Sequence, residues 1–151
     1  MAVTVKNIEL WRTEVENKPG TLTSVLAPLA EAGADLQLVM GYRYPGNEAK
    51  SAIEVFPVKG RKAAAAAGAA GLQPAAISAV LIEADNRVGL GHAIALALAD
   101  AGINLDFLVA QTVGRKCTAV AGFGNAEDAR RATVLIRKAA GARKKKAGRA
   151  R

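Results

Sequence analysis

The sequence predicts an α+β fold in which one β-α-β-β-α unit occurs twice, each with an antiparallel sheet and its helices on one face. Two observations predict this fold: a repeat within the chain and the spacing of apolar residues inside each copy. Shifted by 69 positions, residues 16–43 align with residues 85–112 without a gap. Apolar, glycine and charged positions coincide together, which indicates two copies of one supersecondary unit. The identical pairs include Asn17 and Asn86, Gly20 and Gly89, Leu29 and Leu98, Gly33 and Gly102, and Leu36 and Leu105.

Each copy opens with a strand, a glycine-ended turn and a helix. The first strands are expected at residues 8–15 and 77–84, and the second of these is almost wholly apolar, as is typical of a buried strand. The first helix of copy one has apolar residues at i, i+3, i+4 and i+7, which form one face: Leu22, Val25, Leu26 and Leu29. Pro28 lacks a backbone donor and is therefore predicted to kink this helix or to shorten it.

Two strands and a second helix complete each copy. Alternating apolar residues predict strands over about 36–43 and 103–109, and the return strands and second helices are expected at 51–58 with 61–70 and at 116–123 with 126–140. This order is the ferredoxin-like split arrangement without its last strand. Either both copies lack that strand, or the strand near Ile77 extends backward and serves both. The expected domains are residues 1–75 and 76–141, followed by a disordered basic tail at 142–151.

Composition limits the classes of protein that fit. The chain has 151 residues, is 51% hydrophobic, and contains no run of about 18 apolar residues that could cross a membrane. The single cysteine, Cys117, cannot form an internal disulfide, which favours a cytoplasmic location. The last nine residues hold six of the 21 basic residues and no acid, so only +2 of the net charge of +8 belongs to the rest of the chain. Such a tail is typical of a solvated end, and nucleic-acid binding is not expected.

The turn sequences resemble those of ACT domains. In copy one, the segment from Glu16 to Leu22 (Glu-Asn-Lys-Pro-Gly-Thr-Leu) follows a strand, precedes an amphipathic helix, and is followed by Ala-Gly-Ala-Asp-Leu at the next strand. Copy two repeats this order with Asp-Asn-Arg-Val-Gly from Asp85 to Gly89, and later with Ala-Gly-Ile-Asn-Leu. The resemblance covers roughly residues 7–140. It implies a tandem ACT-domain protein, which would be a non-catalytic regulator that binds a small ligand, most often an amino acid, at interfaces between domains or subunits.

The resemblance also implies where such a ligand would lie. The matching positions are Glu16, Asn17, Pro19, Gly20, Thr21 and Leu22 in copy one, and Asp85, Asn86, Gly89, Leu90 and Gly91 in copy two. Unpaired N–H groups at a helix N-terminus favour an anion such as a carboxylate, and an acidic side chain could pair with an ammonium group. The alternative is that these residues only cap helices and close turns. Copy two departs from the pattern, with Val88 at the proline position and Gly91 at the helix leucine.

Other sites have little support in the sequence. His92 is the only histidine, so neither a metal site nor a catalytic Ser-His-Asp arrangement is predicted, and no cofactor is expected. Two alternatives to a ligand sensor stay open: a module that only dimerises or binds other proteins, and a weakly nucleic-acid-associated protein that uses the basic tail. If the last strand is absent, each first strand has a free edge, which predicts that the two copies, or two chains, join sheets there and form a homodimer. A regulated enzyme or another protein is the expected partner of a sensor.

Overall fold

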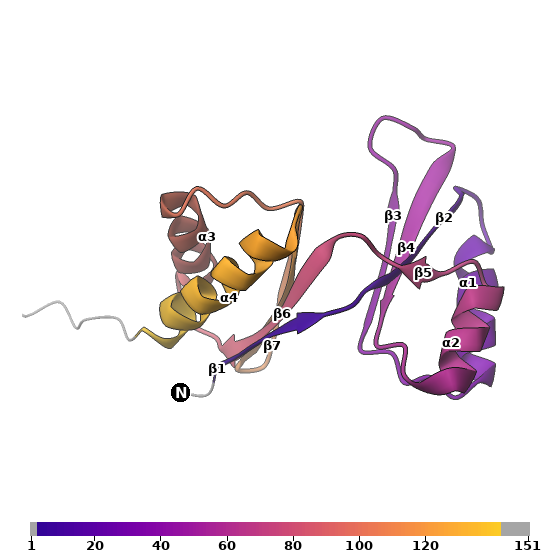
Figure 1. Ribbon diagram of the computed structural model, residues 1–151, viewed down its shortest axis with the longest axis horizontal. Coiled ribbons are helices and arrows are strands. Elements are labelled where there is room, and N and C mark those ends of the chain that lie inside the picture. The colour runs from indigo at the N-terminus through magenta and orange to yellow at the C-terminus, as the bar shows by residue number, and fades with distance from the viewer. Residues whose placement is uncertain (1–2, 143–151) are drawn as a thin grey trace, which may run out of the picture. The chain divides into compact units, whose positions relative to one another are not determined.

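The computed structural model describes residues 3–142, which form two compact units (Figure 1). The inner unit consists of residues 8–77, and the outer unit consists of residues 3–7 together with 78–142. Each unit has a four-stranded antiparallel sheet and two helices, which confirms the predicted α+β class. The expected disordered tail lies outside the described residues, apart from Ala142 at its start. No helix within residues 3–142 is long and apolar enough to span a membrane.

The inner unit contains copy one of the repeat. Its elements are β2 (Trp11–Glu16), α1 (Thr21–Glu31), β3 (Leu38–Arg43), β4 (Lys50–Phe56), α2 (Gly60–Ala69) and β5 (Gln73–Pro74). The strand order is β3-β4-β2-β5, and β4 pairs antiparallel with both neighbours, so that Ile53 lies beside Thr13 and Gly41. The core joins both helices to one face of the sheet through Val25, Leu29, Ile53, Val55, Ala67 and Leu72.

The outer unit contains copy two and the N-terminal strand. Its elements are β1 (Val3–Ile8), β6 (Ser78–Asp85), α3 (Leu90–Asp100), β7 (Phe107–Val113), β8 (Lys116–Phe123) and α4 (Ala126–Gly141). The strand order is β1-β6-β8-β7. Its core is built from small and medium aliphatic side chains around Phe123, including Val80, Ile82, Leu98 and Ile136.

Both units have a fourth strand, and neither of the two predicted arrangements is correct. The two-residue strand β5 closes the inner sheet beside β2, and β1 closes the outer sheet beside β6. The run expected as one strand at 8–15 is divided, because β1 ends at Ile8 and β2 begins at Trp11, with Leu10 fully buried between them. β6 is therefore paired on both sides, whereas β2 is paired along its length with β4 but with β5 only at Trp11 and Arg12. The edge on which a dimer was predicted is thus closed in the outer unit and partly closed in the inner unit.

Two further expectations differ from the structure. α1 continues three residues beyond Pro28 and has eleven residues, the same length as α3, so the proline does not shorten it. Val25 and Leu29 bury the apolar face of α1 on both sides of the proline, which keeps the helix on the sheet. The strand expected from Ile103 begins at Phe107, because Ile103 packs into the outer core from the connection after α3.

Candidate functional site

A cavity of about 230 Å³ lies in the inner unit where the loop before α1 meets β3 and β4. We call it the α1 cavity. Its walls include five residues of the segment that the repeat singled out, together with parts of three strands. The lining residues are Val15, Glu16, Asn17, Lys18, Thr21, Leu22, Gly41, Tyr42, Arg43, Ser51, Ala52 and Ile53.

Asn17 holds the loop of this cavity in place. Its side-chain amide donates to the carbonyl oxygen of Glu48 at 2.8 Å, and its side-chain oxygen accepts from the Ser51 hydroxyl at 3.0 Å. The Asn17 backbone N–H also donates to the carbonyl of Ala49 at 2.9 Å. These bonds tie the start of the loop to β4 and to the turn before it. Asn17 therefore positions the wall of the cavity, and both polar groups of its side chain already have partners.

Thr21 places a hydroxyl group without a partner at this site. It is the first residue of α1, and its Oγ1 atom is buried without a hydrogen-bond partner in the described part of the chain. A buried hydroxyl that forms no hydrogen bond costs free energy, so such a group is often explained by an unseen water or ligand. Gly20, directly before it, has φ +88°, a left-handed conformation that favours glycine and turns the chain into the helix.

The rim of the α1 cavity carries both signs of charge. Lys18 Nζ lies 2.8 Å from a carboxylate oxygen of Glu16, and this hydrogen bond lowers the pKa of Glu16 and raises that of Lys18. Arg43 forms a longer ion pair, with its guanidinium 3.7 Å from the Glu48 carboxylate. Pro19 and Gly20 do not line the cavity; they shape the turn behind it.

Sequence reasoning missed the half of the cavity that β3 and β4 supply. Gly41 gives the cavity room, since a Cβ built there meets no atom within 4 Å. A glycine inside a strand often marks the close approach of a ligand or another chain, so Gly41 was the available signal. Arg43, Ser51 and Ile53 carried no comparable signal, because only the pairing of β3 with β4 brings them beside the loop.

In the outer unit, the residues of the corresponding loop before α3 are engaged in contacts within the protein. Leu90, at the position of Thr21, is 3% exposed and belongs to the hydrophobic core. Asp85 forms an ion pair with Lys116 across the β6–β8 ladder, and this hydrogen bond lowers the pKa of Asp85. Asn86 donates its backbone N–H to Arg115, and Gly89 has φ +82° before α3. Gly91 is exposed in the first turn of α3.

A buried acidic residue lies in β4 between Ile53 and Val55, whose side chains pack toward the helices, so its own side chain lies on the other face of the sheet. The Glu54 side chain is fully buried, accepts a hydrogen bond from the Tyr42 hydroxyl at 3.2 Å, and lies 3.9 Å from Arg12 Nε. Burial raises the pKa of Glu54, while the hydrogen bond from Tyr42 and the charge of Arg12 act in the opposite direction. Tyr42 and Arg12 project from the same face of the sheet as Glu54, so this carboxylate is not part of the α1 cavity.

Comparison with known proteins identifies the fold. No protein-family model matches the sequence, and no curated protein sequence does. Among solved structures, the protein BT0572 from Bacteroides thetaiotaomicron is similar over 89% of this chain and 88% of its own, with 18% identity and a TM-score of 0.69. The ligand-free regulatory subunit of aspartate kinase from Thermus thermophilus is similar over 92% and 97%, with 18% identity and a TM-score of 0.60. A putative C-terminal regulatory domain of aspartate kinase from Porphyromonas gingivalis W83 is similar over 93% and 97%, with 13% identity and a TM-score of 0.57.

The class defined by these findings is an α+β protein with a ferredoxin-like fold in each unit. At these low identities the similarity establishes the fold alone. The chain spans nearly the full length of the two regulatory aspartate kinase structures described above.

Proposed function

We propose that this chain is a non-catalytic regulatory protein that binds a small amino acid in the α1 cavity of the inner unit. The observation that carries the proposal is that Thr21, whose hydroxyl is buried without a partner among residues 3–142, lines a cavity formed by the loop that the repeat singled out. The fold, shared with structures described as regulatory, supports a role in controlling another protein. A regulated enzyme is the partner that this role implies.

The chemistry of the walls suits a zwitterion. Lys18 and Arg43 are exposed cations on the rim that would attract a carboxylate, and the ligand's ammonium group would compete with Lys18 for the Glu16 carboxylate. Val15 and Ile53 offer apolar contact, and Thr21 offers a hydroxyl that can donate or accept. A binding site with an apolar wall and a few polar groups is typical of small-molecule recognition. The outer loop lacks an equivalent hydroxyl because Leu90 fills that position in the core, so the inner unit is the proposed binding unit.

Calorimetry against the twenty common amino acids tests this function. We expect one small amino acid to bind, and Thr21→Val to weaken it by roughly 0.5–1.5 kcal/mol, the usual contribution of one hydrogen bond. Gly41→Leu should abolish binding by filling the cavity, because Gly41 has open space and no left-handed backbone. Ala110→Leu is the matched control, since Ala110 occupies the same place in β7 of the outer unit. If no amino acid binds below millimolar concentration, the chain is better explained as an interaction module.

A further inference from the structure

A second cavity of the inner unit lies between the end of α1 and the start of α2. Its volume is about 330 Å³, and residues of the α1–β3 connection and the first turn of α2 line it. Three basic side chains, Lys59, Arg61 and Lys62, line this cavity, and Asp35 is the one acidic residue among its lining residues. We call it the α2 cavity. It shares no lining residue with the α1 cavity.

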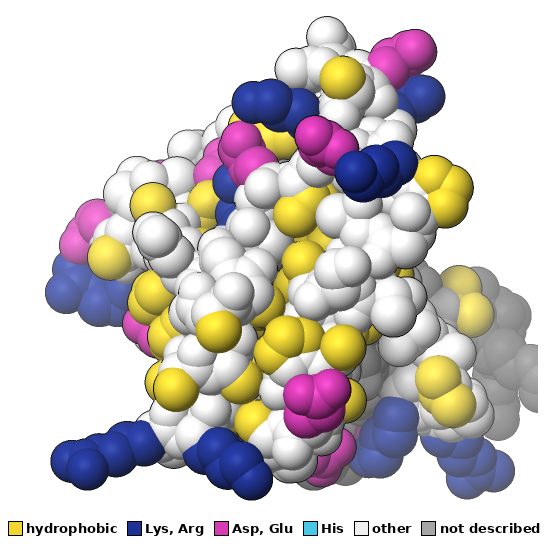
Figure 2. All heavy atoms as spheres, turned by 90° about the vertical axis from the view of Figure 1, so that its right-hand side faces the viewer, with side chains coloured by type: hydrophobic (Ala, Val, Ile, Leu, Met, Phe, Trp, Pro, Cys, Tyr) yellow, Lys and Arg dark blue, Asp and Glu magenta, His cyan; other side chains and the backbone are white. Residues whose placement is uncertain are grey.

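The positive charge of the α2 cavity is not neutralised by the protein. Within residues 3–142, Lys59, Arg61 and Lys62 take part in no ion pair, and their side chains form no hydrogen bond. The first turn of α2 contains no acidic residue, and its N-cap residue Lys59 supplies no capping bond. Like charges placed this closely repel one another, and the positive end of the helix dipole adds to that cost. Figure 2, which faces α1 and α2, shows Lys and Arg side chains projecting from the lower edge of this face.

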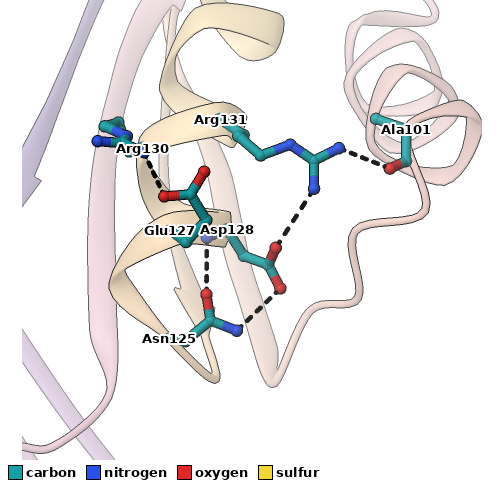
Figure 3. Close-up of polar contacts among 6 residues, drawn as sticks. All are labelled: Ala101, Asn125, Glu127, Asp128, Arg130 and Arg131. Carbon is teal, nitrogen blue, oxygen red and sulfur yellow. Dashed lines mark hydrogen bonds and ion pairs between the residues drawn. The ribbon is translucent and has the colours of Figure 1, made fainter.

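The outer unit has the opposite arrangement at the same place in its fold (Figure 3). Asn125 caps α4 by accepting from the Asp128 backbone N–H at 2.8 Å, and Glu127 pairs with Arg130. Arg131 then lies 3.6 Å from the Asp128 carboxylate and donates to the Ala101 carbonyl at 2.9 Å. This arginine links the first turns of α4 to the end of α3. The helix N-terminus is thus capped, balanced by acids and bridged to its neighbour.

Comparing the two units position by position shows what has changed. When the two N-cap residues are aligned, Lys59 takes the place of Asn125, Lys62 that of Asp128, and Ala65 that of Arg131. Two acids are thus replaced by two cations, since Arg61 also stands where Glu127 stands in α4. Ala65 has only a methyl side chain, so it cannot bridge the two helices of the inner unit as Arg131 does in the outer unit. The same fold therefore closes this region with its own side chains in one unit and leaves a basic cavity in the other.

We propose that the α2 cavity binds the phosphate group of a small phosphate monoester. A phosphate carries nearly two negative charges at neutral pH and accepts several hydrogen bonds, which matches the three cations and the uncapped first turn. The cavity also extends to Asp35 and Gln37, whose side chains can bond hydroxyl groups on the organic part of the ligand. A phosphate monoester can therefore contact both the basic residues and the Asp35–Gln37 side of the cavity, whereas inorganic phosphate would contact only the basic residues.

The test is calorimetry of the full chain at low ionic strength with glycerol 3-phosphate as the probe, compared with inorganic phosphate and glycerol. We expect saturable binding of glycerol 3-phosphate that is at least tenfold tighter than binding of inorganic phosphate, and none of glycerol. In the triple variant K59Q/R61Q/K62Q, binding should weaken at least tenfold. The matched control K6Q/R115Q/K138Q removes the same charge from exposed sites of the outer unit and should bind like the parent. The basic C-terminal segment is present in every variant, so its own attraction to phosphate cancels.

A second variant copies the closed network into the inner unit. K62D/A65R introduces the acid and the arginine that Asp128 and Arg131 supply in the outer unit, and it should abolish binding while thermal unfolding followed by circular dichroism shows a melting temperature no lower than that of the parent. Equal loss in the triple variant and its control would show that net charge alone attracts the phosphate, which overturns the site. Inorganic phosphate binding as tightly as the monoester overturns the ligand class. Absence of glycerol 3-phosphate binding in the parent overturns the proposal.

Discussion

Two glycines within strands, Gly41 in β3 and Gly122 in β8, show how differently one residue type is used in the two sheets. A Cβ added to Gly122 in β8 would lie 2.2 Å from a ring carbon of Phe107, whereas a Cβ added to Gly41 in β3 would meet no atom within 4 Å. Gly122 is thus needed because the Phe107 ring of the neighbouring strand packs against its backbone. Gly41 is not needed for packing, which is consistent with a role in leaving room for a ligand.

Alanine at these two glycines should therefore have different effects on stability. Gly122→Ala should lower the free energy of unfolding by roughly 1–3 kcal/mol, the usual cost of overpacking, because the Phe107 ring must move. Gly41→Ala should change it little, since its site is open. Urea denaturation of both variants measures the difference. Equal effects would contradict the packing explanation for Gly122.

The buried carboxylate of Glu54 should make stability depend on pH. Burial raises the pKa of Glu54 above its ordinary value of 4.5. The folded state therefore holds the proton more tightly than the unfolded chain, so this contribution to stability is complete below pH 4.5 and is lost as pH rises through the raised pKa. We expect Glu54→Gln, which cannot ionise, to lack this fall. Denaturant unfolding at several pH values above 4.5 measures it, and parallel profiles for parent and variant would refute the assignment.

At the scale of elements, local signals in the sequence predicted most of the structure. β8 has the predicted bounds, Lys116–Phe123, and α4 exceeds its prediction by one residue. Alternation and helical spacing are properties of neighbouring residues, so they can be read without knowing the fold. The partner of β1 could not be read in this way, because β1 pairs with β6, more than 70 residues later in the chain. The α1 cavity was half predicted for the same reason: its loop is local, whereas its β3 and β4 walls depend on strand pairing.

The pairing of β1 with β6 predicts that the N-terminal strand stabilises only the outer unit. Val5 is 4% exposed in the outer core, and Arg137 donates to its backbone carbonyl at 2.9 Å. Removing residues 1–7 deletes both contacts and uncovers β6, so the outer unit should lose at least the roughly 1.5–3 kcal/mol of one buried valine. Hydrogen exchange should accelerate in β6 and remain slow in β4. Equal acceleration in both strands would show that β1 supports the whole chain.

At the scale of the whole molecule, the free sheet edges determine how chains could associate. In the outer unit β6 is paired on both sides, so the edges of the described sheet are β1 and β7, and β7 is paired with β8. β7 contains no charged residue, and its six residues after Phe107 are all exposed, including Leu108, Val109 and Val113. Natural edge strands usually carry charges or bulges that prevent pairing, and β7 has no such charge. An antiparallel pair of β7 strands around a twofold axis would also place Ala110 opposite its own copy, without a clash of charges.

We therefore predict a homodimer that joins two outer sheets through β7. Light scattering at micromolar concentration should show a dimer for the parent and a monomer for Val109→Lys, because the substitution places two like charges diagonally across the axis at the centre of the joined edge. Val134→Lys is the control: Val134 is 63% exposed on α4, away from this edge, and its substitution should leave the dimer intact. A monomeric parent would mean that the exposed apolar edge serves another partner. A dimer that persists in Val109→Lys would place the interface elsewhere, with the edge strands β1 and β3 as the next to substitute.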